Sequence, residues 1–214
     1  MRPWYRFSHD VVQGLFRLLY GIRIKGRQNL PETGPALIAC NHRSLLDPPL
    51  VGCLLPEEAG FVAKAELFEV PVLAGLIRSL NAIPIDRRKL SLEKMDELAE
   101  FLGTGKFLLY FPEGTRQPAG QLAARAKVGV GVLLSKQPVP VIPTYVEGTE
   151  TPLRSLFRRG RMRVAFGRPF ALPKEADFSD EKDWSRAIAD EVMDQIRALK
   201  EQREAEDSRE SSSR

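Results

Sequence analysis

Short apolar runs alternate with helical repeats along most of this chain. The apolar runs predict strands at 36–40, 61–63, 82–85, 106–111, 139–146 and 162–166. Apolar residues that recur every three or four positions predict helices at 48–55, 72–80, 92–102, 126–136 and 183–200. Strands that alternate with helices predict an α/β fold, in which a layered sheet is flanked by helices. Polar motifs follow several of these strands directly, which is where sheets of this type place their sites.

The two ends of the chain differ from this middle part. Residues 8–20 predict a helix whose apolar side chains fall largely on one face, with aromatic and basic residues before it. This pattern is typical of an amphipathic helix at a membrane interface, and it also fits a helix packed on the core. Residues 201–214 are polar and predict a disordered tail. We therefore divide the chain into an N-terminal interfacial helix with its lead-in at 1–30, one folded domain at 31–200, and the tail.

Positive charge is concentrated in two segments. The 214 residues are 43% hydrophobic and carry a formal net charge of +4, which suits one folded domain with a modest basic excess. Residues 1–30 hold six basic residues and one acid, and residues 153–168 hold six arginines and no acid. Basic patches of this kind attract anionic membranes, phosphorylated substrates or nucleic acids, although a solvated surface can have the same composition.

Cysteine usage and hydropathy indicate the compartment. Cys40 and Cys53 are too few for a disulfide framework and suit a reducing environment. Every apolar run falls short of the roughly 18 residues that a bilayer-spanning helix needs. The N-terminal run is interrupted by polar residues, and no small-residue cleavage site follows it. We therefore expect a cytoplasmic protein, either soluble or peripheral on the inner face of the cell membrane.

The segment 41–47 contains one of the two histidines, His42, followed five residues later by Asp47. On an ideal helix five steps separate two side chains by roughly 140°, so these two meet only if the chain turns back. Pro48 favours a helix that starts here, with Asp47 at its N-cap and His42 in the preceding loop. Asp47 then accepts a hydrogen bond from one imidazole nitrogen and leaves the other nitrogen as a general base. The alternative is a helix cap beside an ordinary loop histidine.

A protein nucleophile is not identified next to this pair. Ser44 is too close to His42 in sequence for a clear placement beside the ring, and Cys40 lies in a predicted strand. A His/Asp pair without a nucleophile favours direct deprotonation of a substrate hydroxyl.

Cations gather where two other predicted strands end. The strand at 82–85 runs into Asp86 and then Arg87, Arg88 and Lys89. Arginine binds phosphate in bidentate fashion, and lysine supplies a point charge. The alternative is a solvated strand end in which Asp86 pairs with one of these cations.

The strand at 106–111 runs into a compact loop, Pro-Glu-Gly-Thr-Arg at 112–116. Such a loop can offer backbone N–H groups and Arg116 to a phosphate, with Glu113 orienting the cation. The alternative is an ordinary turn. Farther along, the segment 139–143 is apolar and contains two prolines. By itself it indicates only an apolar wall beside a site.

Together these four segments resemble the phospholipid/glycerol acyltransferase family, especially its small bacterial lysophosphatidate acyltransferases. The resemblance extends from about residue 26 to residue 149. The family blocks are Asn-His-x-x-x-x-Asp at 41–47, an apolar strand ending in arginine at 82–88, Phe-Pro-Glu-Gly-Thr-Arg at 111–116 and Val-Pro-x-x-Pro at 139–143. Four blocks in the family's order and spacing are far more specific than any one of them.

The resemblance implies a role for each matching residue. His42 corresponds to the general base and Asp47 to its orienting partner. The acceptor-phosphate site corresponds to Arg87 or Arg88 together with Glu113, Gly114, Thr115 and Arg116, and Lys64 corresponds to a lysine near the same phosphate. From this we expect the imidazole of His42 to lie at the mouth of a cationic pocket.

The resemblance also implies the reaction and its partners. A fatty acyl group passes from acyl-CoA or acyl carrier protein to the free hydroxyl of lysophosphatidate, forming phosphatidate without a covalent acyl-enzyme. The expected partners are the lysophospholipid acceptor, the acyl donor and an anionic membrane surface, and no metal, cofactor or nucleic acid is expected.

The sequence departs from the family pattern at Asn81, where many relatives have glycine. This departure predicts a different local backbone in the second block.

Three alternatives remain at this point. The same chemistry can act on glycerol-3-phosphate, another lysophospholipid or an amino-acid lysolipid. A catalytically silent lipid-binding protein can share the fold, although intact His42 and Asp47 argue against it. A nucleic-acid binder can use the arginine-rich run at 154–168.

Overall fold

The computed structural model describes residues 1–86, 91–156 and 160–212. The strands are β1 (Arg23–Lys25), β2 (Ala36–Cys40), β3 (Ala59–Lys64), β4 (Ala82–Ile85), β5 (Phe107–Tyr110), β6 (Val141–Glu147) and β7 (Arg163–Phe166). The helices are α1 (Pro3–Tyr20), η1 (Arg27–Asn29), α2 (Asp47–Gly52), η2 (Ala65–Phe68), α3 (Pro71–Ser79), α4 (Leu92–Gly103), α5 (Gly129–Lys136), α6 (Pro152–Ser155), η3 (Glu175–Asp177) and α7 (Glu181–Ser212).

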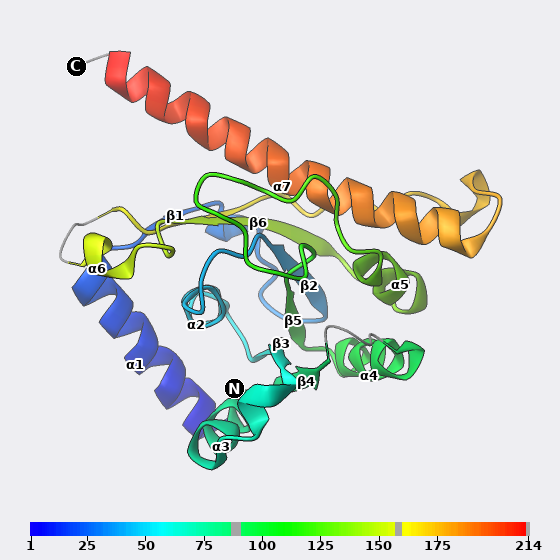
Figure 1. The fold of residues 1–214 in the computed structure, drawn as a ribbon, viewed down its shortest axis with the longest axis horizontal. Coiled ribbons are helices and arrows are strands. Elements are labelled where there is room, and N and C mark those ends of the chain that lie inside the picture. Colours follow the sequence, from blue (N-terminus) through cyan, green and yellow to red (C-terminus); the bar gives the residue numbers. More distant parts are fainter. Residues whose placement is uncertain (87–90, 157–159, 213–214) are drawn as a thin grey trace.

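One sheet contains all seven strands of the described residues, in the order β1-β7-β6-β2-β5-β3-β4. Neighbouring strands run parallel except for β6 and β7, which are antiparallel. Helices cover both faces of this sheet (Figure 1). The predicted α/β fold with a layered sheet is therefore confirmed. Short β1 was not predicted, because three residues at a sheet edge leave little periodicity to detect.

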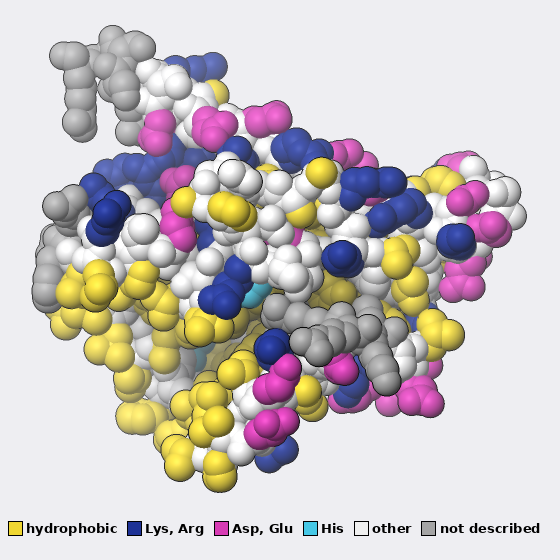
Figure 2. Space-filling view, in the orientation of Figure 1, with side chains coloured by type: hydrophobic (Ala, Val, Ile, Leu, Met, Phe, Trp, Pro, Cys, Tyr) yellow, Lys and Arg dark blue, Asp and Glu magenta, His cyan; other side chains and the backbone are white. Residues whose placement is uncertain are grey.

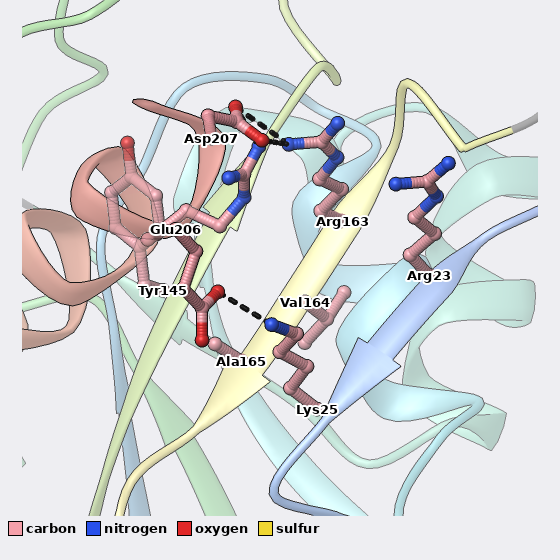
Figure 3. A pocket seen from close by; sticks show the side chains of 9 residues that line it. Arg23, Lys25, Tyr145, Arg163, Val164, Ala165, Glu206 and Asp207 are labelled. Carbon is pink, nitrogen blue, oxygen red and sulfur yellow. Dashed lines mark hydrogen bonds and ion pairs between the residues drawn. The ribbon is translucent and has the colours of Figure 1, made fainter. Parts of the chain in front are cut away.

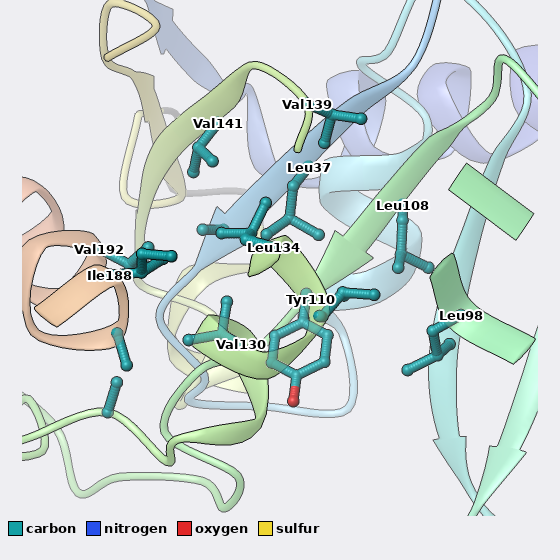
Figure 4. Packing of buried hydrophobic residues seen from close by; sticks show 14 of the residues in the cluster. Leu37, Leu98, Leu108, Tyr110, Val130, Leu134, Val139, Val141, Ile188 and Val192 are labelled. Atoms are coloured by element: carbon teal, nitrogen blue, oxygen red, sulfur yellow. The ribbon is translucent and has the colours of Figure 1, made fainter. Parts of the chain in front are cut away.

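Alternate residues of each central strand pack into different cores. In β2, Leu37 and Ala39 face the core formed with α4, α5 and α7, whereas Ala36, Ile38 and Cys40 face the core formed with α1 and α2. Figure 4 shows Leu37 in the first core beside side chains from α4, α5 and α7. A parallel strand buried on both faces reads as a continuous apolar run, which is the pattern that predicted β2.

The prediction of a disordered tail is wrong for residues 201–212, because α7 continues to Ser212. Ion pairs attach the end of this helix to the basic edge of the sheet. Lys25 Nζ lies 2.5 Å from Glu206 Oε2, and Arg163 Nη1 lies 3.0 Å from Asp207 Oδ2 (Figure 3). Asp207 thus neutralises one arginine of the basic segment 153–168, and Glu206 neutralises Lys25. These pairs reduce the positive charge available to a nucleic acid.

Helix α1 has a packed face and an exposed face. Tyr5 and Phe16 are buried, and the Tyr5 hydroxyl donates to Ala59 O (3.2 Å) and accepts from Ala59 N (3.0 Å). Gln13 Nε2 donates to Cys53 O at 2.6 Å. The opposite face exposes large apolar side chains. The helix therefore packs on the core through one face and has a free apolar face of the kind that an interfacial helix needs. Within the described ranges, no helix has the length and apolar character needed to cross a membrane.

Candidate active site

The candidate site is assembled at the carboxyl ends of three neighbouring strands. β2 lies between β5 and β6 and is parallel to both, so the segments that follow these strands emerge at one edge of the sheet. The segment after β2 carries His42 and Asp47, the segment after β5 carries Glu113, and the segment after β6 carries Thr149. This edge is the position predicted from the fold class.

His42 and Asp47 are in direct contact. The Nδ1 atom of His42 lies 2.9 Å from Asp47 Oδ2, and the Asp47 side chain is fully buried. The same Oδ2 accepts hydrogen bonds from the backbone N–H groups of Arg43 (2.6 Å) and Ser44 (2.7 Å). The chain therefore turns back around the carboxylate, as the spacing required. The predicted N-cap was one residue away, because Leu46 is the N-cap of α2 and Asp47 is the first helical residue.

Thr149 completes the set of donors to Asp47, and no sequence motif pointed to it. Its hydroxyl donates to Asp47 Oδ1 at 2.5 Å, and the residue is fully buried. The carboxylate thus accepts from two backbone N–H groups, one hydroxyl and one imidazole. Hydrogen bonds to a buried carboxylate orient it and stabilise its charge. Thr149 is distant in sequence from Asp47, so only the pairing of β2 with β6 brings the two together.

The imidazole of His42 is more enclosed than expected at the mouth of a pocket. Its side chain is 5% exposed, and its ring stacks on Phe111 with centroids 4.3 Å apart and planes inclined by 29°. Because the Asp47 carboxylate is an acceptor, Nδ1 carries the proton and Nε2 has the free lone pair. Among the described residues, none forms a hydrogen bond with Nε2. This arrangement suits a general base.

The nearby thiol is a poor nucleophile in this structure, and the nearby hydroxyl is part of the turn. Burial, together with the charges of Asp47 and Glu113, raises the pKa of the Cys40 thiol well above its usual value. Ser44 Oγ accepts a hydrogen bond from Leu46 N at 3.2 Å and serves the turn between His42 and Asp47. Both observations agree with a dyad that acts directly on a substrate.

Glu113 holds the backbone of His42 and does not orient Arg116, so that part of the prediction is wrong. Its Oε2 accepts from His42 N at 2.6 Å, and its Oε1 accepts from Ala123 N at 2.9 Å. Burial raises the pKa of this carboxyl group, whereas the two N–H donors and the charge of Arg43 act in the opposite direction. Glu113 therefore joins three segments of chain at the site.

The loop that carries Arg116 is attached to His42 by a second contact. Gln117 N donates to His42 O at 2.8 Å, and Gly114 adopts a φ of 70° that favours glycine. Thr115 and Arg116 are exposed, and Arg116 forms no hydrogen bond or ion pair with any other described residue. Its guanidinium is therefore available to a ligand.

No contact among the described residues joins the other predicted cations to this loop. Lys64 is exposed at the end of β3, and its Nζ lies 2.8 Å from Glu66 Oε1. Arg87 and Arg88 lie outside the described residues.

Asn81 adopts a φ of 61°, a conformation that favours glycine and is tolerated by asparagine. The asparagine at this position therefore does not require a different backbone from that of relatives with glycine.

Arg43 also belongs to the site, although its role was not predicted from the sequence. It is 6% exposed, its Nη2 donates to the Tyr145 hydroxyl at 2.8 Å, and its guanidinium lies 5.5 Å from the centroid of that ring. Tyr145 belongs to the core formed with α7, so Arg43 points to the opposite face of the sheet from Phe111 and α2. This contact secures the residue next to His42.

Comparisons with known proteins show the family to which the chain belongs. The family model described as Acyltransferase matches residues 21–147. The 1-acyl-sn-glycerol-3-phosphate acyltransferase of Bacillus subtilis is 25% identical over 91% of this chain and 96% of its own length. The Pseudomonas aeruginosa protein of the same name is 33% identical, over 67% of this chain and 55% of its own length.

A solved structure shares the architecture. The crystal structure of the 1-acyl-sn-glycerophosphate (LPA) acyltransferase PlsC from Thermotoga maritima superposes with a TM-score of 0.70 at 26% identity, covering 94% of this chain and 84% of that one. The sheet, the flanking helices and the His/Asp pair thus define an enzyme of the O-acyltransferase class. The chain belongs to the Acyltransferase family.

Proposed function

We propose that this enzyme transfers a fatty acyl group from a thioester donor to the free hydroxyl of lysophosphatidate, forming phosphatidate. The observation that carries the proposal is the 2.9 Å contact of His42 Nδ1 with buried Asp47, which leaves Nε2 without a protein partner. The names of the relatives from Bacillus subtilis and Pseudomonas aeruginosa support lysophosphatidate as the acceptor.

The proposed mechanism uses the dyad as a general base and then as a general acid. Nε2 of His42 removes the proton from the glycerol hydroxyl as its oxygen attacks the thioester carbonyl. Asp47 stabilises the imidazolium that forms. The C–O bond of the new ester forms, the C–S bond breaks, and the leaving thiolate takes the proton from the imidazolium. Acyl-CoA and acyl carrier protein both supply such a thioester, and the balanced reaction needs no cofactor.

The acceptor phosphate is assigned to the loop at 112–116. Arg116 is exposed, and the contacts of Glu113 and Gln117 keep its loop against His42. An arginine that binds the phosphate there places the acceptor hydroxyl near Nε2, which is a proximity effect. Arg87, Arg88 and Lys64 remain proposed contributors to the same site.

Product identification tests this proposal. Purified enzyme is given lysophosphatidate, glycerol-3-phosphate, lysophosphatidylcholine and an amino-acid lysolipid, each with acyl-CoA and with acyl carrier protein, and the products are identified by mass. We expect phosphatidate as the main product, because the relatives are named for lysophosphatidate as their acceptor and its phosphate monoester can bind Arg116. Preferential acylation of any other acceptor would reject lysophosphatidate, and no transfer in any pair would reject the enzymatic role.

The same proposal places the enzyme on an anionic membrane surface. Trp4, Phe7, Val11, Leu15 and Leu18 of α1 are all exposed and recur at helical spacing. Exposed apolar residues of α3 and α6 extend this surface, and they include Val72 at 87% and Leu153 at 86% exposure. Figure 2 shows hydrophobic side chains gathered over this side of the molecule. An amphipathic helix with basic residues beside its apolar face is typical of interfacial binding.

Replacing Leu18 with glutamate is expected to weaken binding to vesicles that contain anionic lipid by about tenfold or more, because a charge replaces an apolar side chain at the interface. Sedimentation with vesicles measures this effect. Leu92→Glu is the matched control, because Leu92 on α4 has similar exposure (68% against 73%) and lies outside this surface. Equal binding of the two variants would reject α1 as the docking helix.

A further inference from the structure

We infer that Lys127 supplies a second cation to the phosphate site on the loop at 112–116. The inference rests on the proposed function, since it adds a binding residue for the same acceptor. In the sequence, Lys127 lies between the motif loop and α5, in a segment that contains no recognised motif. Its position next to the loop is visible only in the folded chain.

Both the backbone and the side chain of Lys127 are attached to the motif loop. Its N–H donates to Pro112 O at 2.8 Å. Its aliphatic stem lies over Gly114, where an added Cβ would approach Lys127 Cγ to 3.0 Å and Cε to 3.7 Å. Gly114 therefore has two reasons to be glycine, its φ of 70° and the space that the lysine stem occupies. The ammonium group is consequently held close to the loop backbone.

Lys127 has no acidic partner among the described residues, in contrast to Arg125 and Lys136. Arg125 Nη2 lies 2.5 Å from Asp190 Oδ2, and Lys136 Nζ lies 2.7 Å from Asp96 Oδ1. Lys127 is exposed and forms no ion pair with a described residue, which it shares with Arg116. Arg116 on the loop and Lys127 packed against it are thus both unpaired among the described residues. Two such cations, on a loop attached to a candidate general base, indicate an anionic ligand.

The charge of a phosphate monoester fits two cations better than one. Such a group carries about −1.5 to −2 at neutral pH. Arg116 can bind two oxygens in bidentate fashion, and Lys127 can bind a third as a point charge. Lys127 thereby favours acceptors with a terminal phosphate over acceptors that lack one.

The test compares Lys127→Met with Arg125→Gln, which removes one positive charge from the same segment at a site directed toward Asp190. Binding of a short-chain lysophosphatidate is measured by calorimetry in the absence of donor. We expect Lys127→Met to weaken binding by about tenfold or more, the loss of one charge-assisted hydrogen bond, and Arg125→Gln to have little effect. Lys127→Arg is expected to retain most of the affinity.

Kinetics provide a second measurement on the same proteins. For Lys127→Met we expect a higher KM for lysophosphatidate and an unchanged KM for the thioester. Equal behaviour of Lys127→Met and Arg125→Gln, or no binding of the probe by wild-type protein, would overturn the inference. Lysine-dependent binding without phosphatidate formation would instead support the inference and reject the proposed function. Lys127→Gln serves if the methionine variant fails to fold.

Discussion

Replacing His42 with alanine is expected to reduce turnover by about 10²–10⁴-fold, the usual contribution of a general base. The physical reason is that the free Nε2 is the only basic atom that the dyad presents to a substrate hydroxyl. Steady-state assays with saturating lysophosphatidate and thioester measure the loss. Because the ring also stacks on Phe111, thermal unfolding of the variant is recorded in parallel.

Ser44→Ala is the matched control for this prediction. Ser44 lies in the same turn, and its hydroxyl accepts from Leu46 N, so the variant perturbs the turn without removing the base. We expect it to retain turnover close to wild type, and we expect wild-type protein incubated with the thioester to show no acylation at Ser44 by mass spectrometry. Turnover of His42→Ala within tenfold of wild type would show that the imidazole is not the base, and turnover lost only with Ser44→Ala would indicate a covalent route.

Replacing Asp47 with asparagine is expected to reduce turnover by a similar factor, about 10²–10⁴-fold, because the neutral amide no longer stabilises the imidazolium. The fold should largely tolerate this change. The amide oxygen can still accept from the His42 ring and the two backbone N–H groups, and the Thr149 hydroxyl can rotate to accept from the amide NH2.

Asp47→Ala separates the structural role of this carboxylate from its catalytic role. Alanine leaves buried donors without an acceptor, and each such donor costs about 1–3 kcal/mol. We therefore expect the alanine variant to unfold at a clearly lower temperature than the asparagine variant, while both lose turnover to a similar extent. If Asp47→Asn kept turnover within tenfold of wild type, Asp47 would be only a structural acceptor for the turn.

Several structural features were predictable because they depend on neighbouring residues in the chain. Strand β4 was predicted at 82–85 and occupies Ala82–Ile85, and most other predicted elements agree within a few residues. Helix α1 shows where periodicity fails. Its apolar residues were predicted to lie largely on one face, yet the packing buries Phe16 and leaves Leu15 exposed. The polar end of α7 is helical because its acids meet basic residues of β1 and β7, which the tail sequence alone cannot show.

Local order along the chain therefore determined the alternation of strands and helices. Pro48 indicated a turn at which His42 and Asp47 can meet, and the family resemblance implied that they do. Tertiary structure decided which distant residues complete the site. Thr149 reaches Asp47 and Glu113 reaches His42 because β6 and β5 pair in parallel with β2, so that three separate segments end at one edge of the sheet. Hydrogen bonds of this kind depend on the positions of strands in space, and nothing in the local periodicity of a segment specifies its neighbours across the sheet.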